Sequence, residues 1–278
     1  MRTTHALITL VFSIVVFTAS IAQADDLFPD KQLEAAVRRE VFEKRNNTEP
    51  LTEDDVKNIS QVKGKNMGIK SLAGLEKCRS LALIDLEGNE VEDLKPIAEL
   101  KQIQSLNMAG NKIQDVTPIG SLTALQYVEL SGNQIEDLKP LASLANLRSL
   151  YLSNNQIKSL EPIAGLTKLW SLYLQGNPLE NLQPLAKLTN LSSLDLRDTE
   201  TKDLSPLRDL TELRYLMLDQ NQIADLGVLV EMAKKDIEGD KRFAPFWRVY
   251  LTGNPLSDAA KNEQIPELKK LGARLTFE

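Results

Sequence analysis

The chain has 278 residues, of which 42% are hydrophobic, 5% aromatic and 26% charged. This composition is globular rather than disordered, and it predicts an aliphatic core. The formal net charge is −6, and no basic run interrupts the sequence, which argues against nucleic acid or anionic lipid as the partner.

The first 24 residues predict a secretory signal peptide. A weakly basic start, Arg2 and His5, precedes a mostly apolar run over residues 6–22. The small residues of Ala22-Gln23-Ala24 form a cleavage site ahead of Asp25. We therefore expect a secreted or periplasmic chain that is not inserted in a membrane. An uncleaved anchor is the alternative, because the run approaches the length that spans a bilayer.

Cleavage would change the set of reactive groups. It removes Arg2 from the 33 basic residues, so 32 remain against 39 acidic residues, a net charge of −7. It also removes His5, the only histidine, and leaves Cys78 as the only cysteine. This excludes Ser-His-Asp and Cys-His catalysis, nearly every zinc site and an internal disulfide. We expect no catalytic residue, no metal and no cofactor.

Residues 25–58 predict a helical cap at the N-terminal end. Asp30 is a candidate N-cap residue for a helix that carries Leu33 and Val37 on one face. A second helix start, with the spacing of a capping box, lies at residues 52–55. Such a cap would cover the open end of the repeats that follow.

Residues 59–256 contain a 22-residue repeat. The frame is L-x-x-L-x-L-x-x-N-x-I-x-D-L-x-P-L-x-x-L-x-x, and Leu125–Asn146 is one clean copy. Full copies begin at Leu81, Ile103, Leu125, Leu147, Leu169, Leu191 and Leu213, and degenerate copies begin near Ile59 and at Phe246. A fixed period of this length predicts a solenoid of stacked coils.

Each recurring residue of the frame has a physical role. The L-x-L core predicts a short strand whose two leucines point inward, and stacked copies would make a parallel sheet. The asparagine amide can satisfy backbone groups where the chain leaves the strand, forming a structural ladder. Thr199 takes this place in the sixth copy. The ladder residues are Asn89, Asn111, Asn133, Asn155, Asn177, Asn221 and Asn254.

A column of aspartate, asparagine and serine residues and a column of prolines predict a short helix in each copy. We expect the first column to supply N-cap residues, and the prolines stand in the first helical turn, where they are tolerated. A calcium-binding ladder is the alternative for the first column. Its members are Asp93, Asp115, Asp137, Ser159, Asn181, Asp203, Asp225 and Asp258.

The C-terminal part departs from the repeat in two places. The copy that starts at Leu213 has 33 residues, and its extra residues predict a longer helix with a charged loop over residues 234–242. A partner-specific protrusion is the alternative for this insertion. Residues 257–278 predict a closing cap, with a helix over 258–271 and a strand over 274–277.

These repeats resemble the 22-residue class of leucine-rich repeats found in bacterial internalins. The resemblance covers residues 59–256 and extends into the cap, through Phe28-Pro29-Asp30 and Leu51-Thr52-Glu53-Asp54-Asp55. It implies an α/β fold, namely a right-handed leucine-rich-repeat solenoid with a parallel concave sheet, short convex helices and a helical N-terminal cap. It also implies recognition of a protein on the concave face.

The single cysteine falls on a core position of the repeat. Cys78 takes the place of Leu100 and Leu122 in later copies, so we expect a buried, inert side chain. A reactive thiol is the alternative.

Tyrosines concentrate on the positions that face outward from the strands. All five tyrosines stand at position 3 or 5 of a copy, beside the inward leucines, and both tryptophans stand at position 2. An amphipathic ring serves a binding surface better than a core, although β-propensity alone also favours tyrosine here. The candidate partner-binding residues are Tyr127, Tyr151, Trp170, Tyr173, Asp195, Arg197, Tyr215, Met217, Trp247 and Tyr250.

The sequence thus predicts a non-catalytic platform that binds a protein. A glycan stacked on the aromatic residues is the first alternative, and flat, coplanar rings would favour it. A hydrolase that uses Asp85, Glu87 and Glu129 is a weaker alternative, because an open sheet gives little reason for shifted pKa values.

Overall fold

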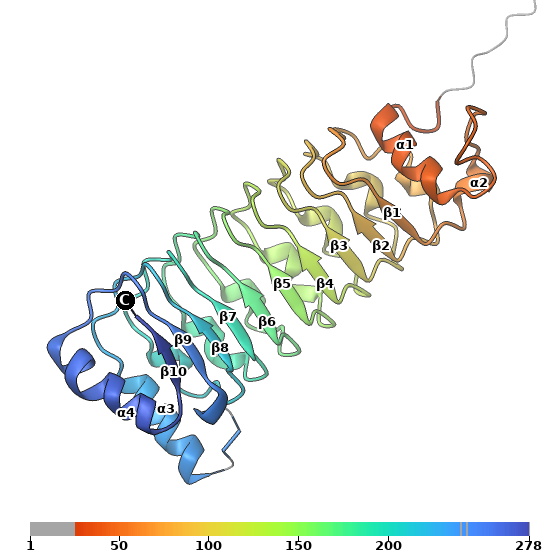
Figure 1. The fold of residues 1–278 in the computed structure, drawn as a ribbon. Helices are drawn as coiled ribbons and strands as arrows, with labels where there is room; N and C mark the ends of the chain where they lie inside the picture. The colour runs from red at the N-terminus through yellow and green to blue at the C-terminus, as the bar shows by residue number, and fades with distance from the viewer. Residues whose placement is uncertain (1–25, 240, 243, 278) are drawn as a thin grey trace, which may run out of the picture.

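A computed structural model describes residues 26–239, 241–242 and 244–277; the predicted signal peptide lies outside them. Ten parallel strands form one sheet in chain order (Figure 1). They are β1 (Gln61–Lys63), β2 (Leu83–Asp85), β3 (Ser105–Asn107), β4 (Tyr127–Glu129), β5 (Ser149–Tyr151), β6 (Ser171–Tyr173), β7 (Ser193–Asp195), β8 (Tyr215–Met217), β9 (Arg248–Tyr250) and β10 (Arg274–Thr276).

The strands use the same three positions of each copy. In β5 the middle residue, Leu150, is fully buried, whereas Ser149 and Tyr151 stay half-buried on the outer face. The register pairs equivalent residues of successive coils, for example Leu150 with Leu172. The inward leucines therefore stack into one continuous aliphatic core, as the two-residue period of a strand requires.

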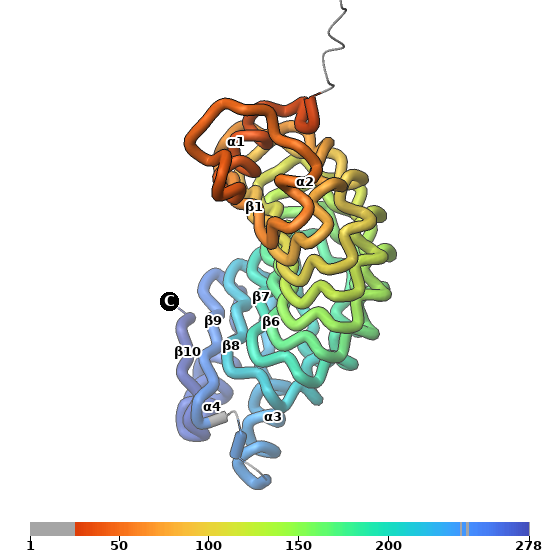
Figure 2. The backbone as a smooth tube through the Cα atoms, turned by 90° about the vertical axis from the view of Figure 1, so that its right-hand side faces the viewer, coloured from red at the N-terminus to blue at the C-terminus, as the bar shows by residue number. Residues whose placement is uncertain are grey.

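Short 3-10 helices lie on the opposite side of the coils from the strands. The stack is curved, with the strands on its inner side (Figure 2). The helices on this side are η1 (Leu75–Lys77), η2 (Lys95–Ile97), η3 (Thr117–Ile119), η4 (Lys139–Ser143), η5 (Glu161–Ile163), η6 (Gln183–Lys187) and η7 (Ser205–Leu207), whereas η8 (Ala244–Phe246) lies directly before β9 in the chain. The predicted prolines stand in the first turn of η2 to η7.

The predicted capping column lies one residue further from the helix than an N-cap. The Asp93 carboxylate accepts from the backbone N–H of Lys95, the first residue of η2, at 2.8 Å, and Leu94 holds the cap position. This is the geometry of an Asx turn, which also satisfies a backbone donor. The same bond recurs at Asp115, Asp137, Ser159, Asn181, Asp203 and Asp225.

The asparagine column joins neighbouring coils through backbone groups. The amide oxygen of Asn155 accepts from Ile135 N–H at 3.0 Å, and its amide nitrogen donates to the carbonyls of Leu130 and Leu152 at 3.0 and 2.9 Å. One side chain thus satisfies groups on two coils that have no sheet partner. Equivalent bonds are made by Asn89, Asn111, Asn133, Asn177, Asn221 and Asn254.

Thr199 interrupts this column, and its neighbour compensates in part. The Thr199 hydroxyl donates to Leu196 C=O at 2.7 Å but has no second donor for the preceding coil. The amide oxygen of Asn221 accepts from the backbone N–H groups of both Thr199 and Thr201.

The N-terminal end is closed by two helices, as predicted from the sequence. In α1 (Lys31–Glu40) the Asp30 carboxylate caps the first turn, and its second oxygen accepts from the N–H groups of Lys70 and Ser71 in the first coil. The helix α2 (Glu53–Val56) begins with a complete capping box at Thr52. Asp30 therefore attaches the cap to the solenoid as well as starting the helix.

At the C-terminal end the insertion forms α3 (Gly227–Glu238), a π-helix follows at η9 (Ala260–Gln264), and α4 (Ile265–Lys270) leads into β10. The predicted charged loop over 234–242 is wrong in its first half, because residues 234–238 continue α3. The predicted cap at Asp258 is also wrong, since the Ser257 hydroxyl accepts from Ala260 N–H. The proposed domain limits stay predictions.

Candidate partner-binding face

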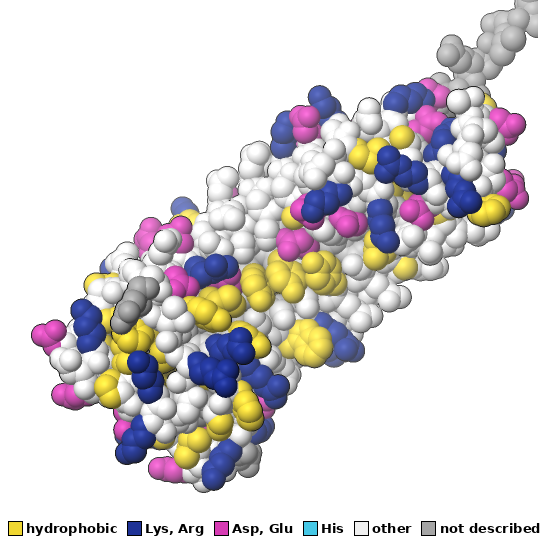
Figure 3. Space-filling model, viewed as in Figure 1, with side chains coloured by type: hydrophobic (Ala, Val, Ile, Leu, Met, Phe, Trp, Pro, Cys, Tyr) yellow, Lys and Arg dark blue, Asp and Glu magenta, His cyan; other side chains and the backbone are white. Residues whose placement is uncertain are grey.

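The concave face presents the first and third residues of each strand. The register sets Tyr127 of β4 beside Ser149 of β5, and Tyr151 of β5 beside Tyr173 of β6. Adjacent strands lie ~4.8 Å apart, so large side chains on neighbouring coils contact one another. An apolar band crosses the middle strands on this face (Figure 3).

Three tyrosines form a continuous group, which we call the aromatic row (Tyr127, Tyr151 and Tyr173). The ring centroids of Tyr127 and Tyr151 are 5.4 Å apart at an interplanar angle of 44°, and those of Tyr151 and Tyr173 are 4.8 Å apart at 38°. The Tyr173 hydroxyl lies 3.0 Å from that of Ser193. The rings are half-buried and tilted, so they support one another without forming a flat platform.

The phenols of Tyr127 and Tyr151 are held in their neutral form. Burial, with the nearby Glu129 carboxylate, raises the pKa of Tyr127 to about 12. Burial also raises the pKa of Tyr151. At neutral pH these side chains offer an apolar ring together with a hydroxyl that can donate or accept a hydrogen bond.

A second aromatic cluster lies towards the C-terminal end, around Tyr215, Met217 and Tyr250. Tyr215 is 43% exposed, and the Arg248 guanidinium lies 5.5 Å from its ring centroid, within the range of a cation–π contact. Between this cluster and Tyr173 the surface forms a hollow of about 620 Å³. The two aromatic groups therefore border one depression, which we call the concave hollow.

Asp195 and Arg197 play different roles at the concave hollow. Asp195 has no exposed surface, so its predicted direct contact with a partner is wrong. Its carboxylate accepts from Arg197 Nε at 2.9 and 3.1 Å and from Nη2 at 2.6 Å. A buried carboxylate needs such a partner, and the pair fixes the guanidinium of Arg197, which stays 38% exposed at the hollow.

The two tryptophans have opposite environments. Trp170 is 54% exposed, and its indole N–H donates to the Ser149 hydroxyl at 3.3 Å. Trp247 is fully buried, so its predicted role in partner binding is wrong. The copy that begins at Phe246 reverses the usual burial: Phe246, in η8, stands where the full copies bury a leucine or isoleucine, yet it is 65% exposed, and Trp247 fills the core instead.

The N-terminal part of the concave face carries the carboxylates of Asp85, Glu87 and Glu129. The Glu87 carboxylate pairs with Lys65 at 2.6 Å, which lowers the pKa of Glu87. Burial raises the pKa of Glu129, although its carboxylate accepts from Ser131 N–H at 2.8 Å. The expectation that the open sheet would leave this carboxylate unshifted is therefore wrong, because burial disfavours its charged form.

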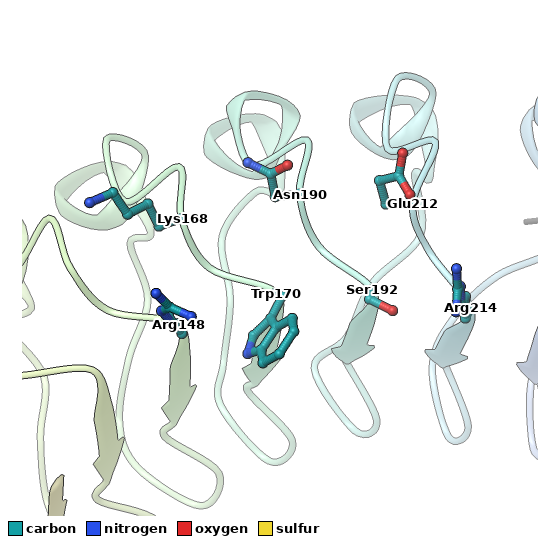
Figure 4. Close-up of a pocket in the computed structure, with 7 residues that line it drawn as sticks. All are labelled: Arg148, Lys168, Trp170, Asn190, Ser192, Glu212 and Arg214. Carbon is teal, nitrogen blue, oxygen red and sulfur yellow. The ribbon is translucent and has the colours of Figure 1, made fainter. Parts of the chain in front are cut away.

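A lateral groove follows the edge of the sheet, and sequence analysis did not identify it. One wall carries Lys168, Asn190 and Glu212, and the other carries Arg148, Trp170, Ser192 and Arg214 (Figure 4). Its volume is about 550 Å³, and Trp170 and Ser192 also line the concave hollow. The signal in the sequence was position 2, which carries Arg148 in the copy before that of Trp170 and Arg214 two copies after it.

Other candidate sites are accounted for within the described residues. There, no group of three or more His, Cys, Asp and Glu side chains could hold a metal ion. None of the helices in this part of the chain is both long and apolar enough to cross a membrane. Cys78 is fully buried, which confirms its predicted place in the core, and burial raises its pKa to about 12, as expected for an unreactive thiol.

Comparisons with known proteins identify the same leucine-rich repeats. A profile of two-copy leucine-rich repeats matches residues 101–143 and 145–187. The crystal structure of internalin C2 from Listeria monocytogenes is 35% identical, with a TM-score of 0.70 over 74% of this chain and 91% of that one. A search of curated proteins found no match.

Two further structures share the fold. A leucine-rich-repeat protein of Leptospira interrogans is 23% identical, with a TM-score of 0.63 over 75% of this chain and 57% of that one. The ectodomain of a membrane receptor kinase from Arabidopsis thaliana, in complex with CASPARIAN STRIP INTEGRITY FACTOR 2, is 26% identical. It matches 59% of this chain and 21% of its own length, with a TM-score of 0.53.

Proposed function

Since the chain belongs to the bacterial internalin-like family of leucine-rich-repeat proteins, we propose that it is an exported, non-catalytic platform that binds another protein on its concave strand face. The observation that carries this proposal is the aromatic row, which continues through the concave hollow to the second cluster at Tyr215 and Tyr250. Rigid aromatic side chains supply large contact areas and dominate the energetics of protein interfaces.

The polar groups on this face also fit a protein interface. Arg197 is already held by the buried Asp195, so a partner that contacts it would lose little side-chain entropy on binding. Arginine beside tyrosine and tryptophan is typical of interface hot spots. Asp195 and Trp247 are buried and drop out of the site. The residues that we propose contact the partner directly are Tyr127, Tyr151, Trp170, Tyr173, Arg197, Tyr215, Met217 and Tyr250.

The ring geometry favours a protein over a glycan. A sugar stacks on flat, exposed and coplanar rings, whereas the rings of the aromatic row are tilted by 38° and 44° and are half-buried. A structural relative that also has leucine-rich repeats, the plant receptor ectodomain, is itself in complex with CASPARIAN STRIP INTEGRITY FACTOR 2. Both observations support a macromolecular partner that packs against the row.

The carboxylates of the concave face do not favour a hydrolase. Glu87 is paired with Lys65, and Glu129 accepts a backbone hydrogen bond from Ser131. Export, with cleavage after Ala24, is part of the proposal and rests on the sequence of residues 1–24.

A double substitution tests the proposal. Tyr151→Ala with Tyr173→Ala should abolish capture of the partner, since hot-spot truncations cost ~2 kcal/mol or more each. Both side chains lie outside the leucine core, so the variant should stay folded, with a loss of stability limited to the packing of these two half-buried rings. The matched control, Lys139→Ala with Glu161→Ala, changes exposed residues on the convex side and should alter neither capture nor stability. Unchanged capture by the tyrosine variant would refute the proposed face.

A further inference from the structure

The lateral groove is cationic, although the chain as a whole is acidic. Arg148, Lys168 and Arg214 line it, and all three are exposed. The one carboxylate in its walls, Glu212, is already paired with Arg242 at 2.8 Å. Within the described part of the chain, no carboxylate pairs with Arg148 or Arg214. A cluster of cations on an acidic protein selects an anionic group on the partner.

Trp170 gives the groove an apolar centre. Its ring is 54% exposed, and its indole N–H is oriented by the Ser149 hydroxyl. Lys168 is held in place because its ammonium group donates to the Asn146 amide oxygen at 2.8 Å. A ligand with an apolar group between two anionic groups would match this lining.

The coil spacing sets the distance between the two arginines. Arg148 and Arg214 occupy the same position of copies three coils apart; at ~4.8 Å per coil they lie about 14 Å apart along the sheet edge. An extended peptide rises ~3.3 Å per residue and places every second side chain on the same side. Residues i and i+4 of such a peptide are thus about 13 Å apart and face the same way, with residue i+2 between them.

We propose that the lateral groove binds an extended acidic segment of the protein partner, with carboxylates at i and i+4 paired with Arg148 and Arg214 and an apolar residue at i+2 on Trp170. This inference rests on the proposed function and adds the chemistry of the partner. The groove joins the concave hollow through Trp170 and Ser192, so one partner can occupy both.

Two synthetic peptides of identical composition test the spacing. The peptide acetyl-Glu-Ser-Leu-Ser-Glu-amide carries its carboxylates four residues apart, and acetyl-Glu-Glu-Leu-Ser-Ser-amide carries them next to each other. Binding is followed by NMR through the indole N–H signals of the exported protein. Trp170 should shift, and Trp247, which is buried, is the internal reference. We expect the spaced peptide to bind about threefold tighter or more, and more weakly at high salt.

A charge-removing variant tests the residues. Arg148→Gln with Arg214→Gln should weaken binding of the spaced peptide about tenfold, since each exposed charge pair contributes up to about fivefold. The control Arg79→Gln with Lys139→Gln removes the same charge from exposed sites elsewhere and should bind like wild type. Both variants alter exposed side chains and should keep the wild-type melting temperature.

Three results would overturn the inference: equal affinity for the two peptides, unchanged binding by the groove variant, or tighter binding of an oligogalacturonate of equal charge. The tyrosine variant separates this inference from the proposed function. It keeps the groove arginines, so it should bind the spaced peptide normally while it loses partner capture. If the tyrosine variant still captures the partner, the concave face is not the binding site. A negative result with the peptides, in contrast, refutes only the proposed role of the lateral groove.

Discussion

Substitution of one ladder asparagine should destabilise the solenoid far more than substitution of the threonine that replaces it. Asn155→Ala removes the acceptor for Ile135 N–H, and no other acceptor for this N–H lies within the described residues. An orphaned buried donor costs ~1–3 kcal/mol. The carbonyls of Leu130 and Leu152 also lose one donor each, but each keeps another, from Asn133 and Asn177 respectively.

The loss in the free energy of unfolding is the sum over these three backbone groups, one N–H and two carbonyls. Adding ~0.5 kcal/mol for each shared carbonyl bond gives a loss of about 2–4 kcal/mol for Asn155→Ala. Thr199→Ala leaves no backbone donor without a partner, because Asn221 still accepts from Thr199 N–H and still donates to Leu196 C=O. Its cost should be about 1 kcal/mol.

The two variants are compared by urea unfolding and by hydrogen exchange of the Ile135 amide. Hydrogen exchange measures the free energy of local opening at the Ile135 amide, and it does so even where a repeat protein does not unfold in a two-state transition. Asn155→Ala should speed exchange at Ile135, whereas Thr199→Ala should not. An equal loss of stability in the two variants would refute the explanation of the asparagine column.

Three further predictions concern ionisation, reactivity and export. Burial raises the pKa of Glu129, so the folded state binds this proton more tightly than the unfolded state and loses stability as the pH rises through the folded pKa. Glu129→Gln should therefore stabilise the protein at pH 7 but not in acid. An equal effect on the free energy of unfolding at both pH values, measured by urea titration, would contradict this. The Cys78 thiol, with a pKa of about 12, should not react with a disulfide reagent at pH 8 until the protein is unfolded; rapid reaction of the native protein would argue for an accessible thiol. N-terminal sequencing of the exported protein should start at Asp25, and an intact Met1 in a membrane fraction would favour the anchor.

The repeat made most of the fold predictable from the sequence. The strand positions, the inward leucines and the prolines in the first helical turn are set by a local pattern that recurs every 22 residues. The position of a residue within a copy did not predict its exposure where the 22-residue pattern is interrupted. Trp247 and Trp170 share a position, yet the insertion and η8 bury the first while the second stays exposed.

The candidate site was only partly predictable for similar reasons. A strand pattern shows which face a residue takes, but Asp195 is buried because Arg197 folds over its carboxylate, a contact between side chains that no spacing reveals. The lateral groove was missed because its two walls come from different positions of neighbouring coils, and they converge only when the coils stack.

The most direct test of the central claim is site-specific photocrosslinking. The photoreactive residue p-benzoyl-phenylalanine is placed at Tyr151, in the aromatic row, or at Lys139 on the convex side, and the exported protein is irradiated in its native surroundings. We predict a discrete conjugate with another protein from the Tyr151 position and none from the Lys139 position. A conjugate from Lys139 alone would contradict binding on the concave face.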